Sequence, residues 1–405
     1  MAQLRRHSVL APLGSIRAAI ASCEPDFILP CDDDAAMQLC ALYAKAGRAR
    51  WSEDSIRDRI GQSLGVPDAY ARMARRGELA VLAAQLGVRT PATGSIETPG
   101  DLQCWLEQYG FPAVLKLDTT WGGQGVTIVD SGVEARRVFA ILRARPPILR
   151  SLARMLLDRD LRYTLRALSR RRPSITVQQF IDGTPANRAV ACWNGRVLAG
   201  TSVEALCTHH ATGPATVVRL IDNPEMAATA ARLVQHLGIS GLWGLDFVVE
   251  RATGAAYLIE VNPRATPTCH LAFGTSPSLP LALYRKITPR PPHAVPTAID
   301  SAVVAMFPGE WQRDPFSAYL KSAYHDVPWR EPKLVRDGTD RPWAERGIAA
   351  RWWAERRRTS LPARGVLDVA PGAGAVPAPA ASGVRAVSGH EPRSRIAASA
   401  ADRST

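Results

Sequence analysis

The sequence predicts a mixed α+β (α/β) fold, and two hairpins with helices around them carry this prediction. The first hairpin turns at Asn194–Gly195, and the second spans Gly241–Arg264. An Asn-Gly pair between apolar runs is a strong hairpin signal, and apolar residues at three- and four-residue spacing predict helices. At 405 residues the chain can hold two or three domains.

Cysteine usage and hydropathy favour a reduced, cytoplasmic protein. The seven cysteines are scattered and lack CxxC spacing, which argues against a disulfide framework. No apolar run reaches the roughly 18 residues of a membrane span. The N-terminal apolar segment is interrupted by Pro12, Gly14 and Arg17, so we do not expect a signal peptide.

The formal charge of +13 comes mostly from one segment. Between Arg143 and Arg172 there are ten arginines and only two acidic residues, so this segment carries +8. Its leucines recur every three or four residues, which predicts one or two helices over Arg145–Arg172 with an apolar and a basic face. A polyanion could bind the basic face, but few aromatic residues are available for base stacking. Nucleic acid is therefore the less favoured partner, and residues 145–172 are where it would bind.

Residues 1–75 predict a small α/β unit. Asp26–Pro30 is a short apolar run that predicts a strand, and helical spacing begins at Ala35. We interpret Asp32–Asp34 as an N-terminal helix cap rather than a metal site, because acids are favoured there. One strand and one or two helices are few for a domain. We therefore expect either that the unit lacks the first part of a full domain or that it packs against its neighbour for stability.

Helices and strands follow one another from residue 76 to about residue 290, which predicts one long α+β domain. One predicted helix ends at Gly87, and three others span 101–109, 134–143 and 224–237. The predicted strands lie at 111–118, 126–130, 175–183, 188–206, 215–222 and 241–262. Residues 291–362 predict an irregular or helical appendage. The Ala/Pro/Gly/Ser-rich tail 363–405 has too little apolar bulk to become ordered.

The second hairpin carries a candidate metal site. With Arg251–Ala255 as the loop, Glu250 pairs with Ala256, and counting back puts Asp246 opposite Glu260. Opposed like charges destabilise a sheet, and a lone buried carboxylate is costly. A divalent cation resolves both problems. From spacing alone, a polar-faced hairpin with solvated acids is an equally good interpretation.

Asn262 completes the candidate set, since it shares a strand face with Glu260. Two carboxylates and an amide oxygen form a hard oxygen set suited to Mg²⁺ or Mn²⁺.

Lys116 and the glycine-rich loop after it form a candidate phosphate site. The chain has 45 arginines and five lysines, so a lysine inside the apolar strand FPAVLKLD points to a chemical requirement. In TTWGGQG the glycines allow backbone amides to turn toward phosphates. The loop is neither a Walker A loop, because GK is absent, nor a Rossmann fingerprint, because a strand follows it.

The order of these parts resembles the ATP-grasp superfamily, in particular carboxylate–amine/thiol ligases and the ATP-binding domain of the carbamoyl-phosphate synthase large chain. The resemblance covers about half the chain, in the segments GELAVLAAQLGVRTPAT, FPAVLKLDTTWGGQGVTIV, TVQQFIDG and GLWGLDFVVERATGAAYLIEVNPR. It implies an ATP-grasp fold of two α+β subdomains (76–290, with the basic insertion 145–172). A small pre-ATP-grasp α/β domain (1–75), which looks truncated at its N-terminus, would precede it.

The resemblance also implies roles for residues that match the family's motifs. Residues implied in contacting nucleotide are Arg76, Lys116, Gly122, Gly123, Gly125, Gln179, Phe180 and Ile181, the last three at the adenine edge. Asp246, Glu260 and Asn262 would hold Mg²⁺. Arg264 would reach the transferring phosphate or the substrate carboxylate, so that Arg264 and Lys116 are the catalytic candidates. Arg76 stands where the family often has a second lysine.

The implied activity is an ATP-dependent ligase that activates a carboxylate as an acyl phosphate for attack by an amine or thiol. Its partners would be small-molecule carboxylates and amines, and a homodimer stays open. Two alternatives remain: a non-catalytic nucleotide-binding module that docks a polyanion, and a degenerate relative kept for interaction. Further candidates for substrate contacts, each with an ordinary surface role as the alternative, are Arg188, Arg219, His209 and His210. Zinc at Cys207 and these histidines is disfavoured because no second cluster completes the site.

Overall fold

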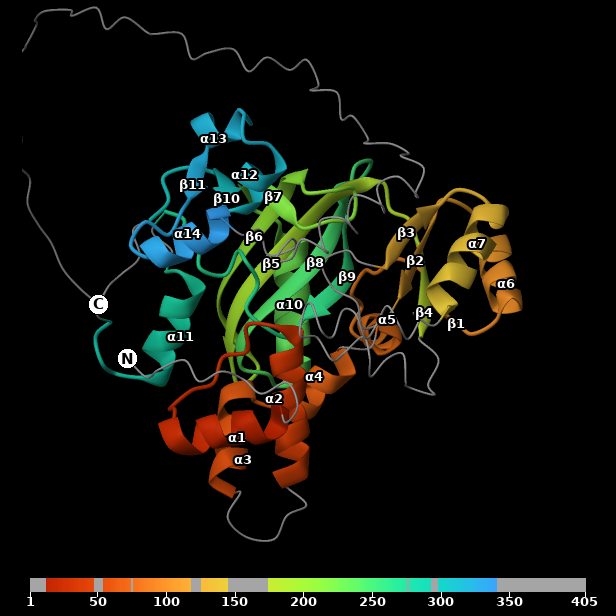
Figure 1. The fold of residues 1–405 in the computed structure, drawn as a ribbon. Coiled ribbons are helices and arrows are strands. Elements are labelled where there is room, and N and C mark those ends of the chain that lie inside the picture. Colours follow the sequence, from red (N-terminus) through yellow and green to blue (C-terminus); the bar gives the residue numbers. More distant parts are fainter. Residues whose placement is uncertain are drawn as a thin grey trace, which may run out of the picture. The chain divides into compact units, whose positions relative to one another are not determined.

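The computed structural model describes residues 12–46, 54–73, 76–117, 125–144, 174–274, 277–292 and 298–340. All of them belong to the first of two units, which ends at Ala363. Two sheets and the helices around them make up this part of the chain (Figure 1). The basic segment 145–172, residues Gly122 and Gly123, and the tail 363–405 lie outside the described residues.

The smaller sheet has four strands in the order β1-β4-β2-β3, and every neighbouring pair is antiparallel. Its strands are β1 (Thr93–Ile96), β2 (Ala113–Leu117), β3 (Val126–Val129) and β4 (Ile175–Gln179). Helices α6 (Pro99–Tyr109) and α7 (Gly132–Arg143) bury Leu102, Trp105 and Phe139 in its core. The strands and helices predicted here are confirmed except β1, which the sequence did not indicate.

The larger sheet has seven strands in the order β11-β10-β7-β6-β5-β8-β9, antiparallel except for β10 and β11. Its strands are β5 (Gly183–Trp193), β6 (Arg196–Thr208), β7 (Ala215–Ile221), β8 (Gly241–Glu250), β9 (Ala256–Asn262), β10 (Val303–Met306) and β11 (Tyr324–Asp326). The predicted hairpin at Asn194–Gly195 is confirmed, with positive φ at both residues (45° and 76°). Positive φ at both central positions is the conformation that favours Asn-Gly in tight hairpins.

Different helices cover the two faces of the larger sheet. Helix α10 (Pro224–Leu237) packs on the face that contains Val190 and Trp243, and α11 (Leu279–Ile287) packs on the face of Ala189 and Leu242. Because side chains alternate along a strand, even-numbered positions of this part of β8 share the α11 face.

The N-terminal region is helical, and the strand predicted at Asp26–Pro30 is wrong. Its helices are α1 (Pro12–Cys23), α2 (Asp33–Ala46), α3 (Asp54–Leu64) and α4 (Pro67–Met73). The Ile28 N–H donates to the Ser63 hydroxyl (2.9 Å), and the Pro30 carbonyl accepts from the Ala265 N–H (3.1 Å). The apolar run is therefore an extended connection that bonds to a helix and a loop, and among the described residues before α5 there is no strand.

The N-terminal helices and the larger sheet share one hydrophobic core, as expected for a region that leans on its neighbour. Tyr70 of α4 is fully buried, and its hydroxyl donates to the Ser240 carbonyl at 2.9 Å. The Trp243 indole N–H donates to the same hydroxyl at 3.0 Å, with the ring centroids 4.4 Å apart. Aromatic packing and a satisfied polar pair thus join α4 to β8.

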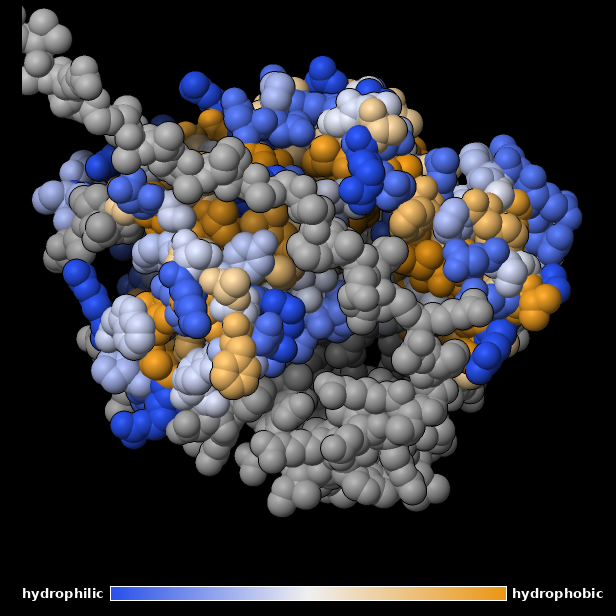
Figure 2. Space-filling view, turned by 90° about the horizontal axis from the view of Figure 1, so that it is seen from above, coloured by the Kyte–Doolittle hydropathy of each residue, from blue (hydrophilic) through white to orange (hydrophobic). Residues whose placement is uncertain are grey.

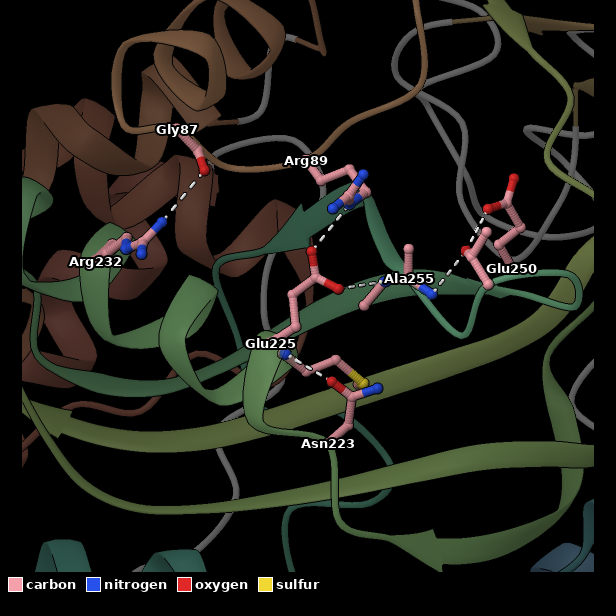
Figure 3. A network of polar contacts seen from close by, with 10 residues as sticks. Gly87, Arg89, Asn223, Glu225, Arg232, Glu250 and Ala255 are labelled. Atoms are coloured by element: carbon pink, nitrogen blue, oxygen red, sulfur yellow. Dashed lines mark hydrogen bonds and ion pairs between the residues drawn. The ribbon is translucent and has the colours of Figure 1, made fainter.

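Helix α5 (Arg76–Gln85) leads into β1, and a polar network fixes the chain between them (Figure 3). Arg89 Nε donates to Glu225 Oε1 (2.9 Å), and the Ala256 N–H donates to Glu225 Oε2 (2.8 Å). Arg232 Nη1 donates to the Gly87 carbonyl (3.2 Å). One carboxylate at the start of α10 therefore ties this connection to the beginning of β9.

Residues 298–340 extend the larger sheet instead of forming a purely irregular or helical appendage. Strand β10 pairs with β7 and β11 pairs with β10, and the helices are α12 (Gly309–Arg313), α13 (Tyr319–Ser322) and α14 (Pro332–Asp340). The two strands have four and three residues. Runs this short carry almost no periodicity, which is why the sequence did not predict them.

The visible surface is of mixed polarity. Figure 2 shows a face on which hydrophilic residues lie among hydrophobic ones. In the described part of the chain, no helix is both long and apolar enough to cross a membrane.

We predict that Tyr70→Ala lowers the free energy of unfolding by about 3–5 kcal/mol, because it leaves a cavity and removes a hydrogen-bond partner of Trp243. Phe316→Ala is the matched control, since that ring is 91% exposed, and it should change stability by less than about 0.5 kcal/mol. Urea unfolding measures both. Equal stability of the two variants would contradict a core shared by α4 and β8.

Candidate functional site

The β8–β9 hairpin places Asp246 directly opposite Glu260, as the sequence predicted, although the predicted register is wrong in detail. Val249, not Glu250, pairs with Ala256, so the loop is one residue longer than expected. A bulge between Asp246 and Phe247 then adds one residue on β9, and the two deviations cancel at the carboxylates.

Asp246 is held by two amide side chains. Asn187 Nδ2 of β5 donates to Asp246 Oδ1 at 2.7 Å, and Asn262 Nδ2 donates to Asp246 Oδ2 at 2.8 Å. Thr268 in turn donates to Asn187 Oδ1 at 3.0 Å. The carboxylate is therefore fixed from two strands before any ligand binds.

Glycine at position 244, opposite Asn262, allows the chain after the hairpin to lie close to β8. A Cβ at Gly244 would stand 2.1 Å from Thr266 Cγ2, a distance that real atoms do not reach. This close approach brings Thr268 within reach of Asn187.

Burial raises the pKa of Asp246 to about 6, and the charge of Glu260 acts in the same direction. The hydrogen bonds from Asn187 and Asn262 and the charge of Arg264 lower the pKa but do not outweigh burial. The pair thus has the electrostatic problem that its sequence implied.

This donor set fits a hard divalent cation. Asp246 and Glu260 face each other, and the Asn262 side chain contacts Asp246, so three oxygen-bearing side chains come together on the α11 face. Each carboxylate oxygen of Asp246 keeps a second lone pair after accepting one amide hydrogen bond. A cation there would replace repulsion with attraction and lower the pKa of Asp246.

Arg264 lies beside this set. Its Nη2 donates to Asn262 Oδ1 at 3.2 Å, and its Nε pairs with Asp33 Oδ2 of α2 at 3.0 Å. The resemblance stated for the sequence placed Arg264 at the same site as the carboxylates, but nothing in the sequence indicated that Asp33 would be its ion-pair partner.

Lys116 of β2 is buried in the smaller sheet, and its Nζ donates to Gln178 Oε1 at 2.6 Å. Gln178 Nε2 donates to Thr93 Oγ1 at 3.1 Å. Sequence reasoning missed Gln178, although alternation along β4 could have found it. Lys116 pairs with Thr176, and Gln178 lies two residues further on the same face.

The segment proposed for the adenine edge lies at the end of β4. The Gln179 N–H donates to the Ala92 carbonyl at 2.8 Å, and the Phe180 N–H donates to the Pro112 carbonyl at 3.4 Å. Within the described residues the Ile181 N–H has no backbone acceptor. Of these three amides, that of Ile181 therefore differs from the other two, which both donate to backbone carbonyls.

The other loop candidates are placed only in part. Gly125 has φ 73°, and its carbonyl accepts from the Leu117 N–H at 2.9 Å, which closes the glycine-rich loop at its base. Arg76 is the first residue of α5, but its side chain lies outside the described residues, as do Gly122 and Gly123.

The remaining candidates do not join the carboxylates. Arg188 pairs with Leu245 and so points to the α10 face, opposite to Asp246, where its Nη1 donates to Ser202. Arg219 forms an ion pair with Glu204. Among the described residues no group of three His, Cys, Asp or Glu side chains could hold a metal ion.

Residues 161–268 match the family model described as an ATP-grasp domain. The matched range contains β4 and the whole β8–β9 hairpin, including Asp246, Glu260, Asn262 and Arg264. This match identifies an ATP-grasp domain within the chain.

Known proteins with similar sequences are carbamoyl phosphate synthase large chains. That of Myxococcus xanthus (strain DK1622) is 28% identical over 213 residues, 50% of this chain but only 17% of the relative. The N-terminal section of the Methanopyrus kandleri large chain is 21% identical over 214 residues, 51% of this chain and 34% of the relative. The ATP-grasp match therefore spans a minor part of these longer proteins.

A similar solved structure supports the fold. The biotin carboxylase domain of Hydrogenobacter thermophilus 2-oxoglutarate carboxylase, in complex with MgADP, ADP and bicarbonate, has a TM-score of 0.50. It is 14% identical, and the match covers 72% of this chain and 60% of that one. The ATP-grasp fold and the mixed helix and sheet class predicted from the sequence are confirmed.

The raised pKa of Asp246 predicts a specific pH dependence of stability. A carboxyl group whose pKa rises from 3.8 to about 6 on folding destabilises the folded protein once it ionises, so its contribution worsens between about pH 4 and pH 6. Without magnesium, the stability of Asp246→Asn relative to wild type should therefore increase over this range, by at most about 3 kcal/mol.

Denaturant unfolding at several pH values in the presence of a chelator measures this difference. The control is Asp130→Asn at an exposed position, which should alter stability by less than about 0.5 kcal/mol. A constant difference between Asp246→Asn and wild type from pH 4 to pH 7 would refute the raised pKa.

Proposed function

We propose that the protein is an ATP- and Mg²⁺-dependent ligase that activates a carboxylate as an acyl phosphate for attack by an amine or thiol. The observation that carries the proposal is the contact chain from Arg264 through Asn262 to Asp246, which lies opposite Glu260. The match of residues 161–268 to an ATP-grasp domain supports nucleotide as the partner of these side chains.

In the proposed reaction a carboxylate oxygen of the substrate attacks the γ-phosphorus of ATP. The bond from this phosphorus to the β–γ bridging oxygen breaks, and ADP leaves. The nitrogen of an amine then attacks the acyl carbon, inorganic phosphate leaves, and the nitrogen loses a proton. Because the transferring group carries little covalent chemistry of its own, catalysis depends on positioning and on neutralising charge.

Each site residue has a role in this scheme. Asp246, Glu260 and Asn262 would hold Mg²⁺, which supplies neutralisation of the phosphate charge when bound. Arg264 would stabilise the charge on the transferring phosphoryl group or orient the substrate carboxylate. Lys116 would contact phosphate, kept in place by Gln178. The Ile181 N–H would donate to adenine.

The Hydrogenobacter domain is a dimer in complex with MgADP, which supports ATP with Mg²⁺ or Mn²⁺ and leaves a homodimer as a candidate here. The seven free cysteines support a reducing, cytoplasmic setting. We favour ligation over a polyanion-docking module because Asp246, Asn262 and Arg264 form one contact chain opposite Glu260.

We predict that Glu260→Gln lowers Mg²⁺-dependent turnover of ATP by on the order of 100-fold or more, because it removes one charged oxygen ligand. Release of ADP and phosphate, with pooled amino and hydroxy acids as substrates, measures turnover. Glu250→Gln, in the same hairpin but at its loop, is the control and should retain activity. Unchanged kinetics in Glu260→Gln would exclude Glu260 as a ligand of the metal ion.

We predict that Lys116→Met weakens binding of a non-hydrolysable ATP analogue roughly 30-fold, the effect of losing about 2 kcal/mol from a buried charge contact. Methionine keeps most of the aliphatic stem and so limits the loss of packing. Calorimetric titration checks this, with the exposed Lys45→Met as control. Equal affinity of both variants would exclude Lys116 from the nucleotide site.

A further inference from the structure

The chain between α1 and α2 meets the chain that follows the hairpin at two adjacent points. The Pro30 carbonyl accepts from the Ala265 N–H at 3.1 Å, and Asp33 Oδ2 pairs with Arg264 Nε at 3.0 Å. Pro30 and Asp33 are three residues apart in the first segment, and Ala265 and Arg264 are adjacent in the second. The backbone hydrogen bond and the ion pair therefore fix the register of this contact.

Three groups hold the guanidinium of Arg264. In addition to Asp33, Asn262 Oδ1 accepts from Nη2 (3.2 Å), and the Ala265 carbonyl accepts from Nη1 (3.3 Å). Arginine has five N–H donors in a rigid planar fork. Within the described residues three of these donors are used, so two on the terminal nitrogens stay available for a phosphate or carboxylate oxygen.

Asp33 is not needed to cap α2. The neighbouring Asp32 does this, since its Oδ1 accepts from the Ala35 N–H at 2.7 Å. Asp33 is the first residue of α2, whose Leu39 and Leu42 are buried in the core shared with the larger sheet. Its carboxylate is therefore presented to Arg264 from a well-packed helix.

The burial of the pair separates it from ordinary surface ion pairs. The Arg264 and Asp33 side chains are 19% and 27% exposed, whereas exposed pairs contribute little because water and salt screen them. The guanidinium is a rigid plane, so the ion pair at Nε acts together with the contacts of Nη1 and Nη2 to set its orientation.

We propose that Asp33 is a positioning residue that orients Arg264 for the transferring group, so that the N-terminal helices contribute to the active site. This inference rests on the proposed function for its catalytic meaning. Asp33 touches no reacting atom. It acts through Arg264, whose remaining donors would be misdirected without it.

A double-mutant cycle tests whether Asp33 acts through Arg264. Asp33→Ala should lower kcat by at least about tenfold, with the KM for ATP within about twofold of wild type. In an Arg264→Ala background the same change should have an effect within about twofold, because coupled residues are not additive. Equal effects of Asp33→Ala in both backgrounds would overturn the proposal.

The control is Asp32→Ala, which removes the cap one residue away. Asp32→Ala should lower Tm while the kcat of the folded protein stays within about twofold of wild type, as expected for loss of a helix cap. If Asp32→Ala and Asp33→Ala lower kcat equally, the effect belongs to the helix and the proposal fails.

A second measurement does not depend on turnover. Phenylglyoxal modifies arginines, and peptide mass spectrometry gives the rate at Arg264. The rate of Arg264 modification should rise several-fold in Asp33→Ala and stay unchanged in Asp32→Ala. Equal rates in the two variants would contradict the proposal that Asp33 orients Arg264. If wild type neither binds nor turns over ATP but Asp33→Ala still accelerates labelling, the proposed function fails while the orientation stands.

Discussion

The opposition of Asp246 and Glu260 across the β8–β9 hairpin is the constraint on which the site depends. Two carboxylates in adjacent strands repel each other, and burial raises the pKa of Asp246 to about 6. The protein supports this arrangement with donors: Asn187 and Asn262 bond to Asp246 from two different strands. The two amides stabilise Asp246 but do not neutralise its charge, so they offset only part of its repulsion with Glu260. This arrangement fits a site that a bound cation completes.

The chain after the hairpin links this constraint to the rest of the molecule. Arg264 pairs with Asp33 of α2, Thr268 bonds to Asn187 of β5, and His270 contacts Asp326 of β11 at 2.8 Å. Seven residues thus connect the N-terminal helices, the centre of the larger sheet and its C-terminal edge. The N-terminal and C-terminal regions therefore have contacts to the segment that carries the candidate catalytic arginine.

Much of the ATP-grasp region was predictable because its strands are long or sharply bounded. Helix α10 and the Asn194–Gly195 turn have strong local signals. The carboxylate pairing was predicted for a partly wrong reason, since a longer loop and a bulge compensate each other. Bulges depend on packing that a sequence does not display. Asn187 and Asp33 could not be assigned their partners, because each contact joins segments far apart in the chain.

Locating a bound metal tests the central claim most directly. Crystals grown with Mn²⁺ and ADP would reveal the metal by its anomalous scattering. We expect a peak roughly 2.0–2.3 Å from carboxylate oxygens of Asp246 and Glu260, with Asn262 beside it and a phosphate oxygen completing the coordination. A nucleotide bound with its metal away from these side chains would contradict the account.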